Sequence, residues 1–451
     1  MALTEVGMMR YQVGRSLQEI GRFIRMNARD LKSPTTRMLR RKLRTLVAYH
    51  IPRMTVSAAL FPFSLVAVVV IRLLRPVVVV RISALNASRI GHLSFDPEMS
   101  AAEKELGVWL PRQPVFDVWY AWRGSYPIAN HQMLAMWRRS LRVWPTWLWQ
   151  RIDSVSRLVP GGAAHVVPIR KNYRGLPDHQ QGDPFRALQR TRPHVSFTDD
   201  EAREARRQLE VAGCDPSARH VCVLVRDPSY QRSVVSGDHS AHDFRDSNIS
   251  KFVPAMQWIA DQGVIVYRMG AVVREPLTPT VPSIVDYASR GMRSELLDVW
   301  LAATCEFFVS TATGLDGVAN AFRRTRVFAD LSQLNSLNLS FDTLSIPKLL
   351  FTESDGRLLT LRESVHAGAL TFVDTTQLTS RGLGLRGNSP EEIVAVVREA
   401  YERRTGTWET RSDEDDLHQR MLAALPESMK MGQVIGRVGY EFLRANQWWL
   451  D

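Results

Sequence analysis

The chain has 451 residues, of which 45% are hydrophobic and 23% are charged; these values exclude a disordered chain and allow two or three domains. Its three cysteines, Cys214, Cys222 and Cys305, lack the spacing of a disulfide framework or a structural zinc site, which favours a reducing compartment. The formal net charge of +12 leaves nucleic acid, anionic lipid or a phosphorylated substrate as candidate partners.

The N-terminal segment, Met1–Arg53, holds most of this excess charge, with twelve Lys and Arg against three Asp and Glu. Because the rest of the chain is nearly neutral, a nucleic-acid binder is disfavoured. The spacing within the segment predicts a basic amphipathic helix of the kind that lies on anionic lipid. Its apolar face comprises Val13, Leu17, Ile20, Ile24 and Leu31, and its basic face comprises Arg15, Arg22 and Arg29.

An apolar run follows, Met54–Ile71, with Pro62 inside it. It is about 18 residues long, near the lower limit for crossing a bilayer, and too far from the N-terminus for a signal peptide. Arg53 and Arg72 flank it, and a single crossing would put one basic flank on the wrong side. The pattern therefore predicts a monotopic or peripheral attachment to the cytoplasmic side of the inner membrane, or a re-entrant one. The alternative is a buried helix of the soluble fold.

Two buried strands are predicted in the first half of the chain, Val77–Ile82 and Val115–Ala121, followed by helices over Gln132–Arg142 and Thr146–Leu158. The first strand is expected to lead into a polar loop that contains Asn86, Ser88, Arg89, Gly91 and His92.

The second half begins with a helix whose capping box is formed by Thr198 and Glu201. Strands and helices then alternate through residues 220–331, which predicts a doubly wound parallel α/β sheet. Ser389 and Pro390 begin a further helix, and the closing segment Met431–Asp451 is predicted as a helix with an aromatic end.

Polar residues follow four successive strands of this half, and ligands of doubly wound sheets bind at the carboxyl ends of the strands. The candidates are Arg226 and Asp227; His242, Asp243 and Arg245; Arg268; and Ser310, Thr311, Thr313, Gly314 and Asp316.

Arginines and helix N-termini are the groups that hold phosphate, so the sequence predicts a diphosphate site. For the stretch from Ser310 to Asp316, a plain capped turn is the alternative. The sequence lacks a Walker motif and a dinucleotide GxGxxG after a strand, which disfavours ATP hydrolysis and nicotinamide binding. No metal and no cofactor is predicted, although Asp238, His239 and His242 leave a metal open. Departure of a nucleoside diphosphate from a nucleotide sugar would then depend on positive charge and N–H donors.

The run "VRDPSY … HDFRDSNISKFVPAMQWIADQGVIVYRMG … VDYA … ELLDVWLAATCEFFVSTATGLDGVA" resembles a family of predicted bacterial glycosyltransferases found largely in surface-polysaccharide loci. "SRIGHL" and the loop Asn130–Gln132 look like first-domain motifs of that family, and the similarity covers Val77–Arg403. It implies a GT-B architecture of two facing Rossmann-like domains. The resemblance assigns an acceptor domain over 77–196 and a nucleotide-sugar donor domain over 197–405. The segment 1–76 lies outside the similarity, and composition alone predicts that it associates with a membrane. A helical segment is predicted over 406–451.

The resemblance implies that Arg226, His242, Arg245 and the loop Ser310–Asp316 belong to the donor site. Arg89 and His92 become cleft residues of the first domain, and Arg89, Asn130 and Gln132 become acceptor-side residues. The family does not supply the base that deprotonates the acceptor. His92 is the first candidate, because it follows the first strand and an imidazole pKa suits the task; Asp243 and Asp316 are alternatives.

The sequence thus predicts a glycosyltransferase that moves a sugar from a nucleotide sugar to a lipid-linked or polysaccharide acceptor at the cytoplasmic membrane face. Two alternatives stay open. A nucleotide-sugar epimerase shares this fold and needs no acceptor, and a non-catalytic membrane-bound sugar-binding or scaffold protein would bind ligand without turnover.

Overall fold

The computed structural model describes residues 51–451 except 123, 125, 170–182, 228, 230–239, 279–280, 338, 340, 373 and 431–433. The predicted amphipathic helix of the N-terminal segment, and Asp238 and His239, lie outside the described residues. The described chain divides into two compact units, and three segments contribute to each. The first unit comprises 51–84, 111–121 and 142–167; the second comprises 85–110, 122–141 and 168–451.

The first unit is built from α3 (Ile51–Leu73), α6 (Thr146–Leu158), β2 (Val115–Trp122) and the first part of β1 (Val79–Asn86). The two strands form a two-stranded sheet, and α3 packs against α6. Their apolar side chains close a small core that includes Val68, Ile82, Val118 and Ile152. Both predicted strands and the α6 helix are therefore confirmed. The predicted N-terminal Rossmann-like domain and the predicted domain boundaries stay predictions.

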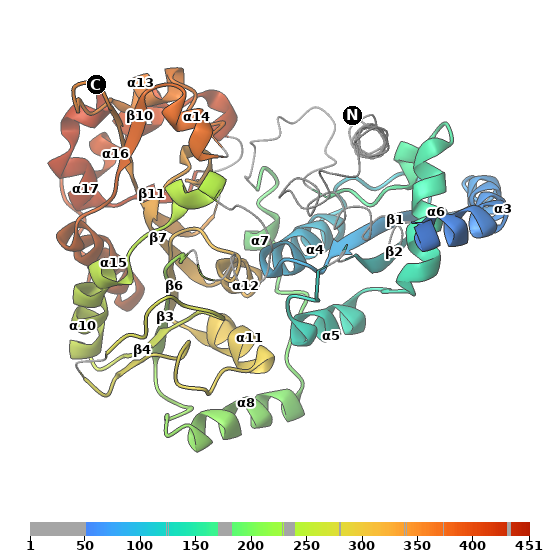
Figure 1. The fold of residues 1–451 in the computed structure, drawn as a ribbon, viewed down its shortest axis with the longest axis horizontal. Helices are drawn as coiled ribbons and strands as arrows, with labels where there is room; N and C mark the ends of the chain where they lie inside the picture. The colour runs from blue at the N-terminus through green and yellow to red at the C-terminus, as the bar shows by residue number, and fades with distance from the viewer. Residues whose placement is uncertain are drawn as a thin grey trace, which may run out of the picture. The chain divides into compact units, whose positions relative to one another are not determined.

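The second unit contains a seven-stranded sheet in the order β11-β8-β7-β6-β3-β4-β5, and every pair of neighbours is parallel (Figure 1). Its strands are β3 (His220–Leu224), β4 (Ile265–Arg268), β5 (Ile284–Val285), β6 (Phe307–Ser310), β7 (Thr325–Leu331), β8 (Thr343–Pro347) and β11 (Arg437–Val438). The chain runs outward from β3 to β5 and then returns to build the other side from β6. The predicted doubly wound parallel sheet is confirmed, and its topological switch point lies between β3 and β6.

Helices cover both faces of this sheet (Figure 1). One group consists of α10 (Val253–Asp261), α15 (Pro390–Thr405) and α17 (Tyr440–Ala445). The other consists of α11 (Glu295–Thr304) and α12 (Asp316–Ala321). Outside these two, α8 (Asp199–Val211) and α5 (His131–Ser140) pack on α11, and α4 (Ile90–Glu105) packs on α12. The predicted capping box at Thr198 forms, and the predicted N-cap Ser389 forms one as well, with Glu392. Each satisfies N–H groups that would otherwise lack a partner at the start of a helix.

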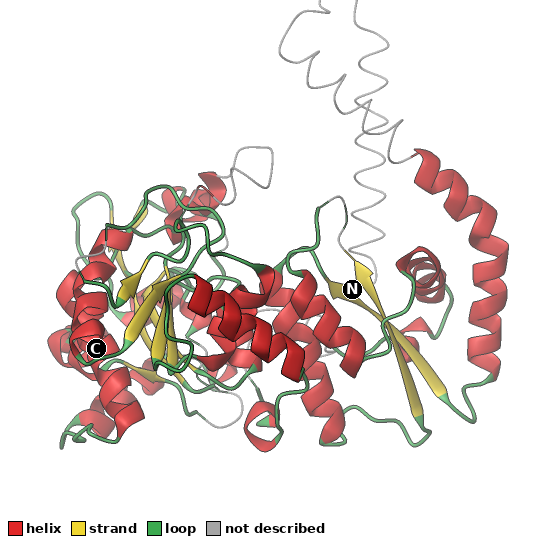
Figure 2. Ribbon diagram, turned by 90° about the horizontal axis from the view of Figure 1, so that it is seen from below, coloured by secondary structure: helices red, strands yellow, loops and turns green. Residues whose placement is uncertain are grey.

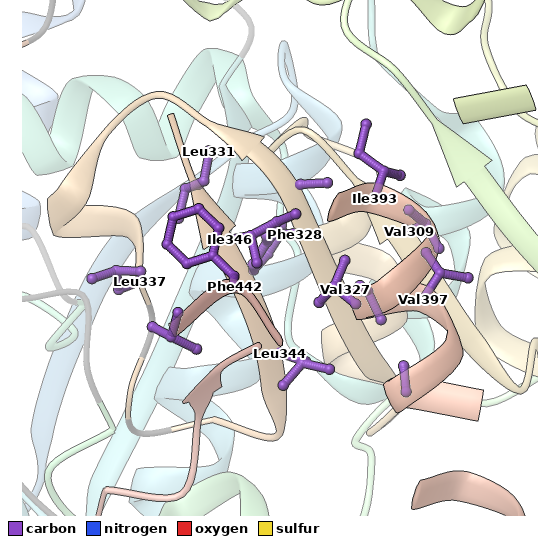
Figure 3. Close-up of a cluster of buried hydrophobic side chains, with 14 of the residues drawn as sticks. Val309, Val327, Phe328, Leu331, Leu337, Leu344, Ile346, Ile393, Val397 and Phe442 are labelled. Carbon is purple, nitrogen blue, oxygen red and sulfur yellow. The ribbon is translucent and has the colours of Figure 1, made fainter. Parts of the chain in front are cut away.

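The main core lies between the sheet and α15 with α17. Figure 3 shows Val309 and Val327 of the sheet facing Ile393 and Val397 of α15. These four side chains are almost fully buried, as is expected for apolar strands whose two faces are both covered by helices. This core fixes the strand ends that carry the polar residues.

The structure corrects two sequence predictions. Arg437–Val438 form the edge strand β11, so the prediction of a helix through the closing segment is wrong there; α17 and the buried Trp449 follow. The predicted polar loop after the first strand is short, because α4 begins at Ile90 and takes Gly91 and His92 into its first turn.

The remaining α-helices and strands belong to the second unit. They are α7 (Ala187–Arg190), α13 (Leu361–His366), α14 (Thr375–Thr379), α16 (Glu414–Ala424) and the antiparallel pair β9 (Leu349–Thr352) and β10 (Leu383–Arg386). Among the described residues, none of the helices combines the length and the apolar character needed to cross a membrane.

Candidate functional site

The switch point of the sheet joins two of the predicted polar segments. Arg226 follows β3, and Thr311 follows β6, the neighbouring strand. The backbone N–H of Arg226 donates to Oγ1 of Thr311 at 2.8 Å. The next residue, Ala312, has a positive φ of 59°, a conformation that costs energy for a residue with a side chain. The carboxyl ends of β3 and β6 therefore lie together at one edge of the sheet.

The loop between β6 and α12 is organised around Asp316. Its Oδ2 accepts hydrogen bonds from Oγ of Ser310 at 2.8 Å and from the N–H of Thr313 at 2.7 Å. Burial raises the pKa of Asp316, although Arg326, these two donors and Arg245 oppose the rise. The Ser310 hydroxyl and the Thr313 N–H are thus used inside the loop, as in the capped-turn alternative. Gly314 is the exposed residue of the loop.

Arg245 reaches this loop from η5, the 3-10 helix Ser240–Arg245. Its Nη2 donates to the carbonyl of Ala312 at 2.8 Å. Burial lowers the pKa of Arg245 to about 10, and the charges of Arg226 and Arg89 act in the same direction, while Asp316 and Asp246 oppose them. Arg89 and Arg226 therefore both lie within electrostatic reach of Arg245; we call these three arginines the arginine cluster.

Two carboxylates, Asp316 and Asp246, partly balance the arginine cluster. Nε of Arg226 pairs with Oδ1 of Asp246 at 3.0 Å. Burial raises the pKa of Asp246, although Arg226 opposes the rise. Gathering like charges is unfavourable unless an anion compensates them, so the cluster is a positively charged site that suits an anionic ligand.

Lys348 holds the segment that carries Arg245 and Asp246. Its ammonium donates to the carbonyls of Phe244 at 3.1 Å and of Asp246 at 2.8 Å. Burial lowers the pKa of Lys348, while Asp330 and Asp246 favour the charged form. The sequence analysis missed this residue, because it follows β8, a strand that was not predicted; a charge directly after an apolar strand was the signal available.

The first turn of α4 packs against the same loop through glycines. A Cβ on Gly91 would lie 3.1 Å from Cα and O of Gly314, and one on Gly317 would lie 2.9 Å from Oγ of Ser94. Only residues without a side chain permit this approach of α4 to α12. The segments "SRIGHL" and "TGLDG", which lie more than 200 residues apart, are therefore in contact.

His92 lies in this first turn of α4, and its Nδ1 is 3.1 Å from Oδ2 of Asp96, one turn further along. A carboxylate at Nδ1 fixes the tautomer of the ring and leaves Nε2 to accept a proton. The imidazole is partly exposed, with 32% of the side chain accessible. The sequence analysis missed Asp96, although the i,i+4 spacing of His and Asp on a helix was a usable signal.

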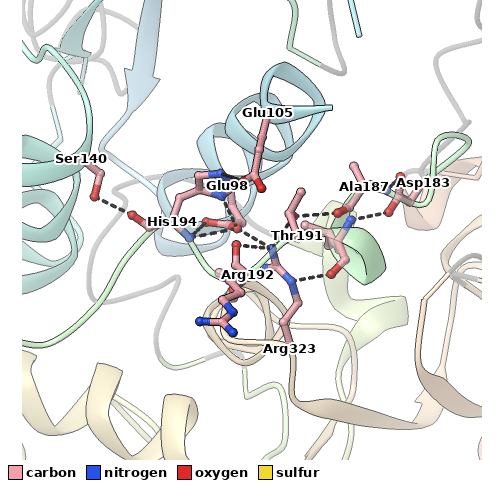
Figure 4. A network of polar contacts seen from close by, with 11 residues as sticks. Glu98, Glu105, Ser140, Asp183, Ala187, Thr191, Arg192, His194 and Arg323 are labelled. Carbon is pink, nitrogen blue, oxygen red and sulfur yellow. Dashed lines mark hydrogen bonds and ion pairs between the residues drawn. The ribbon is translucent and has the colours of Figure 1, made fainter. Parts of the chain in front are cut away.

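A buried network holds α4 against the rest of the second unit (Figure 4). Glu98 of α4 is fully buried; it pairs with Nδ1 of His194 at 3.0 Å and with Nη2 of Arg323 at 2.7 Å. Arg323 also donates to the carbonyls of Leu188 and Arg192. The network explains why α4 belongs to the second unit although it follows β1.

The structure places several predicted site residues in structural roles. Nη1 of Arg268 pairs with Oδ1 of Asp286 at 3.0 Å in a buried ion pair, and no described hydrogen bond joins Arg268 to the arginine cluster. Asn130 caps α5 through the N–H of Met133 and donates to the carbonyl of Glu295. Both side chains are committed to packing the fold.

The other predicted residues lie around the cluster with different exposure. Asp227 accepts the N–H groups of Ser229 and Arg274 and so shapes its own loop. Asp243 is exposed on η5 and His242 is half-buried there. Gln132 lies half-buried in the first turn of α5. In the part of the chain that the structure describes, no three His, Cys, Asp or Glu residues are grouped so that they could hold a metal ion.

No protein-family model matches this sequence, and none of the curated protein sequences is similar to it. Among solved structures, the chain is similar to a family 9 glycosyl transferase from Veillonella parvula, with 7% identity and a TM-score of 0.39 over 72% of this chain and 97% of that one. It is also similar to the ADP-heptose lipopolysaccharide heptosyltransferase II of Escherichia coli, with 11% identity and a TM-score of 0.34 over 60% and 90% of the two chains. Because similarity at this level does not establish a function, we argue the function from the residues of this chain.

Proposed function

We propose that the protein is a glycosyltransferase that uses a nucleotide-sugar donor. The observation that carries the proposal is the arginine cluster at the switch point of a doubly wound sheet, where ligands of such sheets bind. Arg226 and Arg245 extend from two segments that meet at the loop after β6, and Arg89 approaches from the start of α4. A diphosphate carries enough charge to compensate three guanidinium groups.

The proposed reaction is the displacement of a nucleoside diphosphate by an acceptor hydroxyl. The hydroxyl oxygen attacks the anomeric carbon while the bond from that carbon to the phosphate oxygen breaks. Nε2 of His92 accepts the hydroxyl proton, and Asp96 at Nδ1 stabilises the imidazolium that forms. The electron pair of the broken bond leaves with the diphosphate, whose added negative charge the arginine cluster stabilises.

Arg245 is the residue best suited to stabilise the leaving group. Its charged form is already disfavoured by burial and by Arg226, so an approaching anion gains more from it than from an exposed arginine. In this proposal the arginines carry out the charge stabilisation that a divalent ion supplies in other transferases, and no metal takes part.

The finer proposals concern the acceptor and the location. We propose a lipid-linked or polysaccharide acceptor, in keeping with the resemblance to predicted bacterial glycosyltransferases of surface-polysaccharide loci. The basic N-terminal segment and the apolar run support action at the cytoplasmic side of the inner membrane. Products of such a reaction would contribute to the cell envelope.

A binding screen tests the donor proposal. UDP-, GDP-, CMP-, ADP- and dTDP-sugars are added to the detergent-purified full chain and to Arg226→Ala, and the thermal unfolding midpoint is measured. One nucleotide class should raise the midpoint of the parent protein but not that of the variant. The absence of any shift in a folded parent protein would contradict the proposal.

The same samples separate the alternatives. An epimerase converts the bound nucleotide sugar to an isomer without an acceptor, which nuclear magnetic resonance of the sugar would detect. A non-catalytic sugar-binding or scaffold protein gives the thermal shift but neither an isomer nor free nucleoside diphosphate when acceptor-bearing membranes are added.

A further inference from the structure

The outward face of α3 carries a stripe of large apolar side chains. Phe63, Val66, Val70 and Leu73 recur at intervals of three and four residues, which places them on one side of a helix. Phe63, Val66 and Leu73 are 73%, 63% and 74% exposed. We call these four residues the outer stripe. Soluble surfaces seldom expose so many apolar side chains together, so the outer stripe indicates an interaction surface.

The opposite side of α3 is committed to the fold of the first unit. Ser64, Val68 and Ile71 are buried against α6. Nη2 of Arg72 donates to the carbonyl of Ser156 at 3.1 Å and to its hydroxyl at 3.3 Å. Since one side of α3 is packed on α6 along two turns, only its outer side is available to contact a partner. Figure 2 shows α3 as the long helix at the edge of the view.

The charge around α3 identifies the partner. Between Leu31 and Phe95 the sequence contains no Asp or Glu at all. The same stretch contains eleven basic residues, but Arg81 is neutralised by Asp117 in a buried ion pair and Arg89 belongs to the arginine cluster. The other nine are Lys32, Arg37, Arg40, Arg41, Lys42, Arg44, Arg53, Arg72 and Arg75. An apolar stripe set in a stretch of purely positive charge matches a surface that is negative outside and apolar inside, which is an anionic bilayer.

We propose that α3 lies in the plane of an anionic membrane surface, with the outer stripe inserted between the lipid headgroups and the inner side packed on α6. The proposal deepens the membrane association proposed above and rests on it, but it is independent of the donor site. It makes the apolar run a structural helix of the first unit and a lipid-contacting helix at the same time. In this orientation the first unit is held at the membrane through one face of one helix.

A fluorescent label tests the insertion in the full-length protein. Val66→Cys is labelled with a polarity-sensitive dye, and Val211→Cys is the matched control, because Val211 is a 77% exposed valine on α8 of the second unit. The three native cysteines are buried and do not compete for the label. With vesicles containing 30% phosphatidylglycerol in phosphatidylcholine, the label at position 66 should shift to shorter wavelength and the label at 211 should not.

Every other result would overturn the proposal. A short-wavelength emission without vesicles that does not depend on protein concentration shows that another part of this chain covers the stripe. One that grows with concentration, together with a larger particle mass, shows a second copy. No shift with any vesicle, or the same shift with pure phosphatidylcholine, excludes insertion into an anionic surface.

A second variant measures the contribution of the stripe to affinity. Phe63→Ser combined with Leu73→Ser should weaken vesicle co-sedimentation on the order of tenfold or more, because two large side chains no longer leave water. Both residues face outward, so the double variant should unfold at the parental urea concentration. Nucleotide-sugar binding by the same variant should be unchanged, and this readout separates failure of the membrane proposal from failure of the donor proposal.

Discussion

At the scale of single residues, Arg245 distinguishes a diphosphate site from a general basic surface. The substitution Arg245→Gln removes a positive charge that burial and Arg226 already disfavour. It also removes the proposed hydrogen bonds from the guanidinium group to the phosphate oxygens. We expect a loss of about 10- to 100-fold in affinity for the nucleoside diphosphate identified by the screen. Affinity for the corresponding monophosphate should fall less. Isothermal titration calorimetry of both ligands measures the difference.

Arg398→Gln is the matched control for Arg245. Arg398 lies on α15, where it forms an exposed pair with Glu402. Its replacement changes the net charge by the same amount, so both affinities should stay at the parental value. Equal losses in the two variants would show that the affinity depends on overall charge and not on the arginine cluster.

Asp96 is expected to act as a positioning residue for His92. In Asp96→Asn the amide no longer holds a proton at Nδ1 or stabilises an imidazolium, so kcat should fall on the order of 100-fold while KM for the donor stays close to the parental value. A parental kcat in this variant would leave Asp96 as a surface residue.

At the scale of elements, the glycine contact between α4 and α12 positions His92 beside the loop after β6. In Gly317→Ala the new Cβ would meet Oγ of Ser94 at 2.9 Å and backbone atoms of Gly91 at 3.2 Å. Because backbone cannot yield as a side chain can, we expect a loss of about 1–3 kcal/mol in unfolding free energy. Urea denaturation measures it. Parental stability would mean that α4 can shift away from α12 at no cost.

The network around Glu98 gives the packing of α4 a dependence on pH. Burial tends to lower the pKa of His194, but Glu98 and Glu105 outweigh burial and raise it overall. A folded-state pKa above the unfolded value means that His194 stabilises the fold fully below about pH 6.5, and that this contribution is lost as the pH rises through the raised pKa. The difference in urea midpoint between the parent and His194→Gln should therefore shrink with rising pH. A difference that grows with pH would contradict the assignment.

The sequence could predict the elements that alternate regularly, and with them the edge of the sheet where the site lies. Arg226 and Thr311 were both expected at that edge, because β3 and β6 are apolar strands followed by polar residues, and the structure joins them by a hydrogen bond. Arg268 shows the limit of the same argument. Arg268 lies at the carboxyl end of a strand, as a ligand-binding residue of such a sheet is expected to do. Its guanidinium group, however, forms an ion pair with Asp286. Strand order does not reveal side-chain direction.

The parts that escaped prediction depend on contacts between distant segments. The start of α4 resembled a loop, because Gly91 is a poor helix former and Arg89 supplies no side-chain cap. In the structure Gly91 lies so close to Gly314, some 220 residues further along the chain, that a side chain would not fit. Lys348 was missed for a similar reason, since its role appears only when β8 is placed beside β7.

At the scale of the whole molecule, the second unit contains the whole arginine cluster together with His92 and Asp96. Two segments of the second unit, 85–110 and 168–451, supply these residues. The donor site can therefore be complete within one compact unit, while α3 in the first unit carries the proposed membrane contact. The two proposals concern separate residues and can be tested separately.

The measurement that tests the central claim most directly is the release of nucleoside diphosphate from the identified nucleotide sugar. Parent protein and His92→Ala are incubated with the donor and with acceptor-bearing bacterial membranes, with and without EDTA. We predict that the parent releases nucleoside diphosphate only when membranes are present, that EDTA does not stop it, and that His92→Ala releases it on the order of 100-fold more slowly. Tight donor binding without membrane-dependent release, or equal rates for the two proteins, would contradict this account.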